Sequence, residues 1–322
     1  MKSKPVWLAA TIIAAFLSGH AIAQGYPNKP IRLITPYPPG GGVDASARII
    51  GHALSDSFGQ QVLIDNRGGA SGRIGTEIAA KAPADGYHLL MGSVAPNAII
   101  PGSYPKLPYD AIKDFAPISL VAESDYVLAV HPSLPVKSVK DLIALARSQP
   151  GQIAYASSGN LGGPHLAGEL FKQLAKVDMV HVPYKGGGPA TTAILSGETS
   201  LIFGTGPTVV PHAKAGKLRL VASSGTRRSK TMPELPLVSE TLPGHAVTQW
   251  YGVLVPTGTP QEIIARLNSE IVKAVGNPKV AQQLAGLGAD ALSSTPEAFA
   301  AHIAAEIAKW GKVVKSAGIP LD

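Results

Sequence analysis

Three short loops in this chain combine several glycines with residue types that can hold an anion. They are the segments 38–44 (PPGGGVD), 157–163 (SSGNLGG) and 183–189 (PYKGGGP). Glycine lets the backbone approach a ligand closely, and the first N–H groups of a helix are unpaired and carry positive partial charge. A glycine-rich loop that leads into a helix therefore favours binding of a carboxylate or a phosphate. Three such loops indicate a ligand cleft rather than three unrelated tight turns.

The candidate ligand-binding residues come from these loops and from positions near them. They offer backbone amides, small hydroxyls, amide or aromatic contact surface and one lysine. The residues are Tyr37, Pro39, Gly40, Gly41, Gly42, Asp44, Ser93, Asn97, Ser157, Ser158, Gly159, His165, Tyr184, Lys185, Gly186, Gly187 and Gly188.

Three of the candidates also have a structural interpretation. Asp44 stands where a carboxylate commonly acts as the N-cap of a helix. His165 lies in the first turn of another predicted helix, whose positive end favours the neutral imidazole, and it either meets a ligand or ties the loop. Lys185 either contacts an anion or is solvated. The sequence leaves both roles open for each of them.

The first 23 residues predict a cleavable secretory signal peptide. Lys2 and Lys4 precede the apolar run from Val6 to Leu17, and Ala21-Ile22-Ala23 supplies a small-x-small cleavage site. The run is shorter than the roughly 20 apolar residues that span a bilayer. We therefore expect export of residues 24–322 to the periplasm.

The composition removes several classes of protein. The chain has 322 residues and no cysteine, which excludes a disulfide scaffold, a thiol nucleophile and any cysteine-ligated metal. The net charge of +7 is spread along the chain, and its densest cluster, Arg227 to Lys230, lacks the basic stripe that nucleic-acid binding needs. No histidine and carboxylate cluster has metal-ligand spacing. We expect no cofactor, no metal and no nucleic-acid partner.

Two rival functions use the same loops. Gly40-x-Gly42-x-x-Ala45, with Asp65 after the next strand, resembles the dinucleotide fingerprint, but the stiff prolines before it and the export signal argue against that site. An exported hydrolase acting on a small ester or amide is the main alternative. Ser157 or Ser158 with His165 lacks an orienting acid nearby, so a hydrolase would need a triad assembled from distant segments.

Strands and helices are predicted to alternate along the chain. The three glycine loops follow the predicted strands Ile31–Ile34, Ile153–Ala156 and Met179–Val182, and each leads into a helix. This order favours mostly parallel α/β sheets, in which ligands bind at the carboxyl ends of the strands. The C-terminal part predicts helices, with a capping box at Thr259 and a cap at Thr295.

Two long apolar stretches separate the early βα units from the later ones. Ile118–Val130 and Trp250–Val255 are extended in character, and we interpret them as crossover strands between two lobes. The predicted division gives residues 24–124 plus 248–322 to lobe 1 and residues 125–247 to lobe 2. Each lobe is expected to be a mostly parallel sheet flanked by helices.

Five motifs together resemble the Bug family, the extracytoplasmic solute receptors of tripartite tricarboxylate transporters. They are PYPPGGGVD at 36–44, IDNRGGASGRIG at 64–75, YASSGN at 155–160, PYKGGGPA at 183–190, and Trp250-Tyr251-Gly252 followed by Pro256-x-Gly258-Thr259-Pro260. The resemblance covers essentially the whole mature chain. It implies a two-lobed, type II-like periplasmic binding protein, not an enzyme, that closes like a flytrap on a small organic carboxylate.

The resemblance also implies site residues and partners. Family members hold one ligand carboxylate with the glycine-rich loops of both lobes, partly through ordered water. In this sequence that implicates Pro39 to Gly42 in one lobe, and Ser157, Ser158 and Gly186 to Gly188 in the other. The receptor is then expected to deliver its ligand to the membrane subunits of the transporter, or instead to present it to a sensor protein. We expect a monomer.

The sequence departs from the family pattern at the far end of the predicted pocket. Arg73 and Pro96 are unusual there, and Gly204-Thr205-Gly206 replaces a segment that commonly carries an acidic or amide residue. Thr205 therefore joins the candidate residues. These departures leave open whether the ligand is an aliphatic acid, an amino acid or an aromatic acid.

Overall fold

The computed structural model describes residues 25–316, and the predicted signal peptide at 1–23 lies outside the described residues. The chain begins with βα units whose strands pair in parallel. β1 pairs with β2 from Ile31↔Val62 onward and with β3 from Arg32↔His88 onward. The elements are β1 (Ile31–Thr35), α2 (Gly42–Phe58), β2 (Val62–Asn66), η2 (Ala70–Gly72), α3 (Arg73–Ala80), β3 (His88–Ser93), η3 (Ala95–Ile99) and α4 (Ile100–Ser103).

One long strand, β4 (Phe115–Val130), connects the two halves of the molecule. Its first part, Phe115 to Asp125, pairs antiparallel with β9 (Thr248–Pro256). Its last part, Tyr126 to Val130, pairs antiparallel with β7 (Leu201–Thr205) and β8 (Arg219–Ser223). The strand order is therefore β2-β1-β3-β9-β4-β7-β5-β6, with β8 and β10 (Asp290–Ala291) also paired to β4.

The second half repeats the βα pattern. β5 pairs in parallel with β6 and with β7, so the carboxyl ends of these strands lie at one edge. The remaining elements of this half are α5 (Val139–Ser148), β5 (Ala154–Ser157), α6 (Gly163–Ala175), β6 (Val180–Pro183), α7 (Gly187–Leu195), α8 (Gly206–Lys214) and η4 (Val238–Glu240).

Three C-terminal helices return to the first half, as the sequence predicts: α9 (Gln261–Gly276), α10 (Pro278–Gly286) and α11 (Pro296–Ser316). α9 packs on α2 and β4, and α11 packs on α4 and β4. Thr295 caps α11, because its Oγ1 accepts the N–H of Ala298 at 3.2 Å. The prediction of a capping box at Thr259 is wrong. The Thr259 hydroxyl instead donates to the carbonyl of Pro256, and α9 begins at Gln261, two residues after Thr259.

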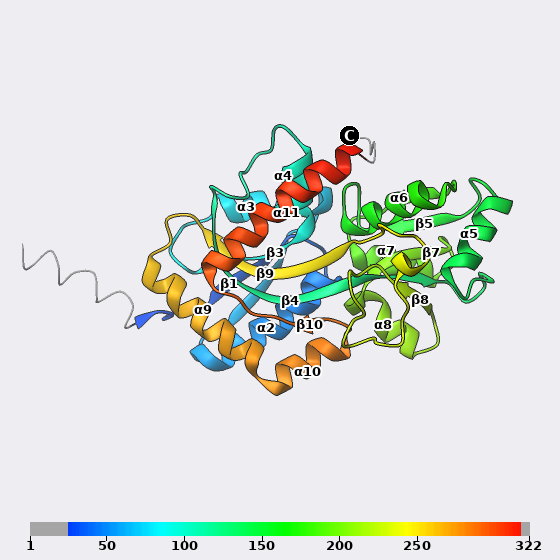
Figure 1. Ribbon diagram of the computed structural model, residues 1–322. Helices are drawn as coiled ribbons and strands as arrows, with labels where there is room; N and C mark the ends of the chain where they lie inside the picture. The colour runs from blue at the N-terminus through cyan, green and yellow to red at the C-terminus, as the bar shows by residue number, and fades with distance from the viewer. Residues whose placement is uncertain (1–24, 317–322) are drawn as a thin grey trace, which may run out of the picture.

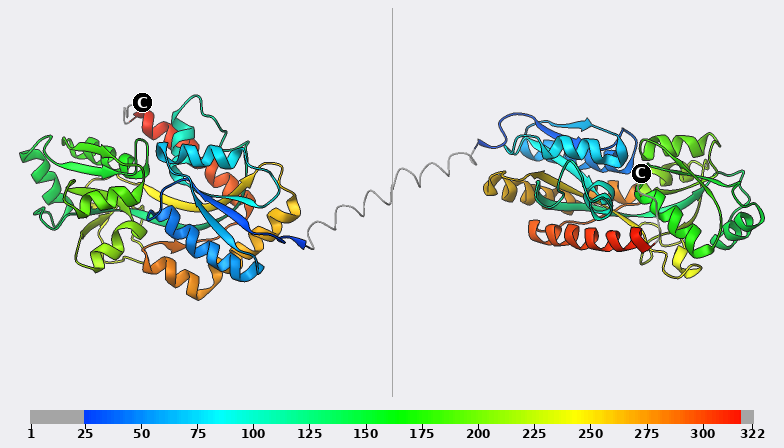
Figure 2. Two further views of the ribbon diagram at one scale, coloured as in Figure 1. Left: turned by 180° about the vertical axis from the view of Figure 1, so that it is seen from behind. Right: turned by 90° about the horizontal axis from the view of Figure 1, so that it is seen from above.

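These elements form two α/β lobes, which confirms the predicted fold class. β4 and β9 run across the middle of the molecule in Figure 1, and the two lobes lie side by side when seen from above in Figure 2. β9 differs from the expected crossover strand, because all its pairings are to β3 and to the first part of β4. The residue bounds given to the lobes stay a prediction. No helix within residues 25–316 is long and apolar enough to cross a membrane.

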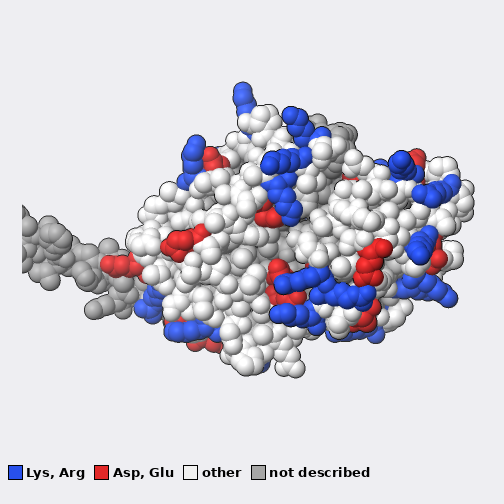
Figure 3. Space-filling view, in the orientation of Figure 1, with Lys and Arg blue, Asp and Glu red and all other residues white. Residues whose placement is uncertain are grey.

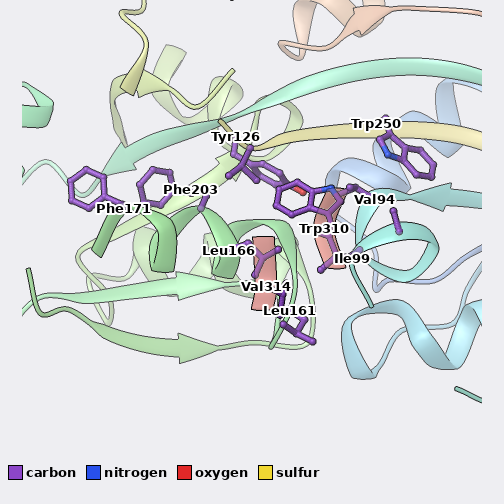
Figure 4. Close-up of a cluster of buried hydrophobic side chains, with 14 of the residues drawn as sticks. Val94, Ile99, Tyr126, Leu161, Leu166, Phe171, Phe203, Trp250, Trp310 and Val314 are labelled. Atoms are coloured by element: carbon purple, nitrogen blue, oxygen red, sulfur yellow. The ribbon is translucent and has the colours of Figure 1, made fainter. Parts of the chain in front are cut away.

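The largest apolar cluster extends through both lobes. Figure 4 shows Trp310 and Val314 of α11 beside Leu166 of α6, with Tyr126 of β4 close by. All four side chains are buried. Burial of large apolar side chains is the main source of stability. This cluster therefore holds β4, the strand that carries Tyr126, firmly in place.

Candidate functional site

A narrow cavity lies between the two lobes where the glycine loops meet. Its volume is about 40 Å³. The lining residues are Tyr37, Gly41, Gly42, Val43, Ala95, Tyr126, Ser158, Gly163, Pro164, Gly187, Ile202, Gly204, Thr205, Thr208, Gln249 and Tyr251. None of these side chains is charged.

Four helices begin at this cavity. Gly42 starts α2, Gly163 starts α6, Gly187 starts α7, and Thr205 is the residue just before α8. The N-cap residues of the four helices make no side-chain capping hydrogen bond, although at α8 the N–H of Gly206 donates to the Ser124 hydroxyl at 3.1 Å. Since each helix start carries about half a positive charge, the backbone alone makes this cavity attractive to an anion. On the face in Figure 3, Lys and Arg are interspersed with Asp and Glu rather than forming a basic field.

The first and third glycine loops touch each other across the cleft. A Cβ atom on Gly188 would lie 2.8 Å from the carbonyl oxygen of Pro39, and one on Gly41 would lie 3.8 Å from the nitrogen of Gly188. Gly186 would likewise bring a Cβ to 3.0 Å from Cδ of Pro38. Only glycine permits this approach of backbone to backbone, so the cleft is closed in this structure.

A hydrogen bond joins the lobes at the rim. The Ser71 hydroxyl donates to the carbonyl oxygen of Asn160 at 2.6 Å, and the Tyr37 hydroxyl donates to the carbonyl of Ser71 at 2.9 Å. Ser71 has φ +54°, a left-handed conformation that non-glycine residues rarely adopt. The turn 68–75, which the sequence marked only as a family motif, therefore takes part in the contact between the lobes.

Asp44 supports the first loop from behind the cavity. Gly41 holds the N-cap position, so the predicted role of Asp44 as the N-cap is wrong. Its carboxylate accepts hydrogen bonds from the Gly40 N–H, from Arg48 and from Asn66, each at 3.0 Å. Burial alone would raise the pKa of Asp44, but these bonds outweigh it and lower the pKa. The charged side chain thereby holds the loop in shape.

The second loop contains a serine and histidine contact that the sequence did not reveal. Ser157 Oγ lies 2.6 Å from Nε2 of His181, and it also accepts the N–H of Gly159 at 3.1 Å. The ring of His181 stacks on that of His165, whose Nδ1 accepts the N–H of Leu161. Parallel pairing of β5 with β6 brings His181 here, so only the register could have shown it. His165 thus ties the loop.

The structure brings some of the predicted residues to the cavity and leaves others outside it. Those in the lining are Tyr37, Gly41, Gly42, Ser158, Gly187 and Thr205. Those in the loop contact beside it are Pro39, Gly40, Gly186 and Gly188. Those outside both are Asp44, Ser93, Asn97, Ser157, Gly159, His165, Tyr184 and Lys185.

Physical reasons keep several of these residues out of the cavity. Ser93 and Asn97 are fully buried behind it, where the Ser93 N–H donates to Asn97 Oδ1 at 3.1 Å. The Tyr184 hydroxyl donates to Glu198 at 2.7 Å, which turns it to the outer surface. Lys185 lines an outer depression that also contains Tyr184 and Arg73.

Three polar side chains of the central strands β4 and β9 were not predicted as site residues. Tyr126 comes from β4, and Gln249 and Tyr251 come from β9. In a strongly apolar strand such residues look like core, and only the family motif around Trp250 drew attention to this segment. Burial raises the pKa of both tyrosines, so both remain neutral hydrogen-bond donors at physiological pH.

Comparison with known proteins identifies the family. Residues 46–319 match the family described as "Tripartite tricarboxylate transporter family receptor", and the chain belongs to it. Protein BugT of Bordetella pertussis (strain Tohama I) is 37% identical over 318 residues, which cover 98% of this chain and 96% of that protein. The recognition of the Bug family in the sequence is thereby confirmed.

Solved structures show the same architecture. An adipate-bound protein of R. palustris is 36% identical, superimposes with a TM-score of 0.88, and is matched over 91% of this chain and 99% of its own. The malate-bound protein MatC of Rhodopseudomonas palustris is 29% identical with a TM-score of 0.84, over 90% of this chain and 100% of its own. This chain is therefore a solute receptor of the periplasmic binding protein class.

Proposed function

We propose that this protein captures a small organic carboxylate in the cavity between its lobes and delivers it to the membrane subunits of a tripartite tricarboxylate transporter. The observation that carries the proposal is the convergence of four helix starts, none of which is capped by the side chain of its N-cap residue, on a cavity without charged side chains. Such a site attracts an anion through backbone dipoles. The adipate and malate held by the two structural relatives support a carboxylate as that anion.

The energetics allow tight binding without a salt bridge. A micromolar dissociation constant corresponds to about −8 kcal/mol. Charge-assisted hydrogen bonds contribute about 1.5–3 kcal/mol each, and helix starts add about 0.3–2 kcal/mol each. Four or five donors around one carboxylate therefore offset the ordering and desolvation costs of binding.

The predicted signal peptide and the family together support a periplasmic site of action. Residues 1–23 would direct export, and the mature chain would act as a monomer that opens and closes between the proposed lobes 24–124 plus 248–322 and 125–247. Opening exposes the helix starts to solvent, and closing on the ligand excludes water, which strengthens each polar contact. The closed protein would then dock on the transporter, or in the alternative role on a sensor protein.

One observation favours a second candidate function, hydrolysis of a small ester or amide. Ser157 Oγ and His181 Nε2 are 2.6 Å apart, as a nucleophile and its base would be. Against this, Ser157 is fully buried and its Oγ already accepts a backbone N–H, so a substrate has no approach to it. A catalytic role therefore requires a rearrangement of the loop 157–163.

A thermal-shift screen distinguishes the two functions. We expect mono- and dicarboxylates, including malate and adipate, to raise the melting temperature of the mature protein, because a ligand that binds only the folded state stabilises it. The matched methyl esters are expected neither to shift the melting temperature nor to be hydrolysed. Turnover of an ester, with no carboxylate giving a shift, would establish the hydrolase instead.

A further inference from the structure

The hydroxyl of Tyr251 is a buried donor that no protein group satisfies. The side chain is 0% exposed, and it lines the cavity from β9. Within residues 25–316, its hydroxyl oxygen has no hydrogen-bond partner. Burial raises the pKa of Tyr251; the side chains of Thr205 and Gln249 face the hydroxyl as hydrogen-bonding groups and lower the pKa by less, yet neither forms a hydrogen bond with it in this structure, so the group keeps its proton. A buried hydroxyl without a partner is unfavourable unless a ligand supplies the acceptor.

The Tyr251 hydroxyl lies against the first residue of α2. A Cβ atom on Gly42 would contact the Tyr251 oxygen and would lie 2.6 Å from Oγ1 of Thr205. Thr208 donates its own hydroxyl to the Thr205 carbonyl at 2.8 Å and lies 3.4 Å from Thr205 Oγ1, a weak contact. Two side-chain hydroxyls and the start of a helix therefore share one small volume at this end of the cavity.

We propose that Tyr251 donates its hydroxyl hydrogen directly to the ligand carboxylate at the start of α2, with Thr205 as the second side-chain donor. The inference rests on the proposed function and specifies its anion position. A carboxylate placed here accepts from the unpaired N–H groups of α2 and from two neutral hydroxyls. No cation is needed, which agrees with the uncharged lining.

The two donors belong to opposite lobes. Tyr251 is held by β9, which pairs with β3 and β4, while Thr205 ends β7 in the other lobe. A carboxylate can accept from both hydroxyls only while the lobes are closed. The pair therefore links recognition of the negative group to closure of the cleft, in the way that differential binding shifts a conformational equilibrium.

Replacement of Tyr251 by phenylalanine tests this assignment, because it removes the hydroxyl and keeps the ring. Isothermal titration with malate and with adipate as probes is expected to show that Tyr251→Phe raises both dissociation constants by about 10-fold or more. The increase in the dissociation constant should be similar for malate and adipate, since the carboxylate is the group they share. Thr205→Val should weaken the binding of both probes in the same way.

The melting temperature of the unliganded protein separates a binding role from a structural one. Because the Tyr251 hydroxyl has no partner in the protein, Tyr251→Phe should leave that temperature unchanged or raise it. A lower melting temperature with unchanged affinity would assign the hydroxyl to the fold and overturn the proposal. Tyr87→Phe is the matched control: it removes a hydroxyl that bonds Asn28 on the surface and should change neither affinity.

The other outcomes are equally decisive. Unchanged affinity of Tyr251→Phe for both probes overturns the inference and leaves the receptor function standing. A loss confined to malate would place Tyr251 on the malate hydroxyl instead of on the carboxylate, which also overturns it. If the wild-type protein binds neither these two nor any other carboxylate, the proposed function fails first and the inference falls with it.

Discussion

At the scale of single residues, the absence of a side chain at Gly42 makes the anion position possible. The glycine starts α2, and its missing Cβ leaves room for the Tyr251 hydroxyl and the Thr205 hydroxyl to face the helix start. Its φ is not in the left-handed region, so alanine is compatible with the backbone there. The need for glycine is therefore one of space and not of conformation.

This argument predicts a loss of binding for Gly42→Ala. The added methyl group would contact both hydroxyls, and overpacking of that kind costs about 1–3 kcal/mol, which corresponds to about 5- to 150-fold in an equilibrium constant. Calorimetric titration with malate or adipate measures the effect. Gly276→Ala is the control, because its Cβ would meet nothing within 4 Å. Equal affinities for the two variants would remove Gly42 from the anion position.

At the scale of elements, closure depends on backbone contact between two loops from different lobes. The start of α7 approaches the loop before α2 so closely that a Cβ on Gly188 would lie 2.8 Å from the Pro39 carbonyl. A second contact, from Ser71 in η2 to Asn160, joins the rim. Strand ends, short glycine loops and helix starts thus form the moving edges of the cleft.

Gly188→Ala is expected to keep the lobes from closing fully. We predict an affinity for carboxylates about 10-fold lower, because the energy of closing must now include an overpacked contact. Small-angle scattering should show the wild-type protein becoming more compact with malate or adipate, and the variant doing so less. Gly286→Ala in α10, where a Cβ meets nothing within 4 Å, serves as control. Equal compaction in both variants would contradict the role of the loop contact.

The stability of the folded protein is expected to depend on pH through His245, which lies in the segment before β9. His245 is fully buried, its Nε2 bonds the carbonyl of Ala167 in α6 at 3.0 Å, and burial lowers its pKa to about 4 from the ordinary 6.5. Below pH 6.5 the His245 imidazole is protonated in the unfolded chain, whereas in the folded chain it stays neutral until the pH approaches 4. Stability from this residue is therefore present above pH 6.5 and lost as the pH falls towards 4, by about 3 kcal/mol at most.

Urea unfolding at a series of pH values checks this expectation. The wild-type protein should lose stability between pH 6.5 and 4, and His245→Phe should lose less over the same interval, whatever its stability at neutral pH. Parallel pH profiles for the two proteins would show that another group controls the change.

At the scale of the whole molecule, the sequence predicted the order of elements well because the signals were local. Apolar runs followed by glycines and helix-starting residues mark each βα unit, and the long strand β4 was visible as the stretch Ile118–Val130. The second predicted crossover strand, Trp250–Val255, does not connect the lobes. The pairing partners of a strand decide which lobe it joins, and β9 pairs only with β3 and the first part of β4. The corrections at Asp44 and Thr259 share one cause: a polar side chain near a helix start often bonds a loop instead.

The glycine loops that line the candidate cavity were predicted from the sequence, and the strand side chains that line it were missed. Loop residues such as Gly42 and Ser158 reach the cavity. Tyr126 and Tyr251 do not stand out in apolar strands, and the contact of Ser157 with His181 depends on the register of β5 and β6. Ser93 ends β3 and Asn97 lies in η3, and they bond each other inside the core.

The central claim is that four helix starts and two hydroxyls hold a negatively charged carboxylate group. Titration calorimetry of the mature protein with malate and adipate, each beside its uncharged diamide, tests it most directly. We predict that at least one acid binds with a dissociation constant in about the micromolar range, while its diamide binds at least about 100-fold more weakly. A diamide that binds as tightly as its acid, or the absence of binding by either acid, would contradict the account.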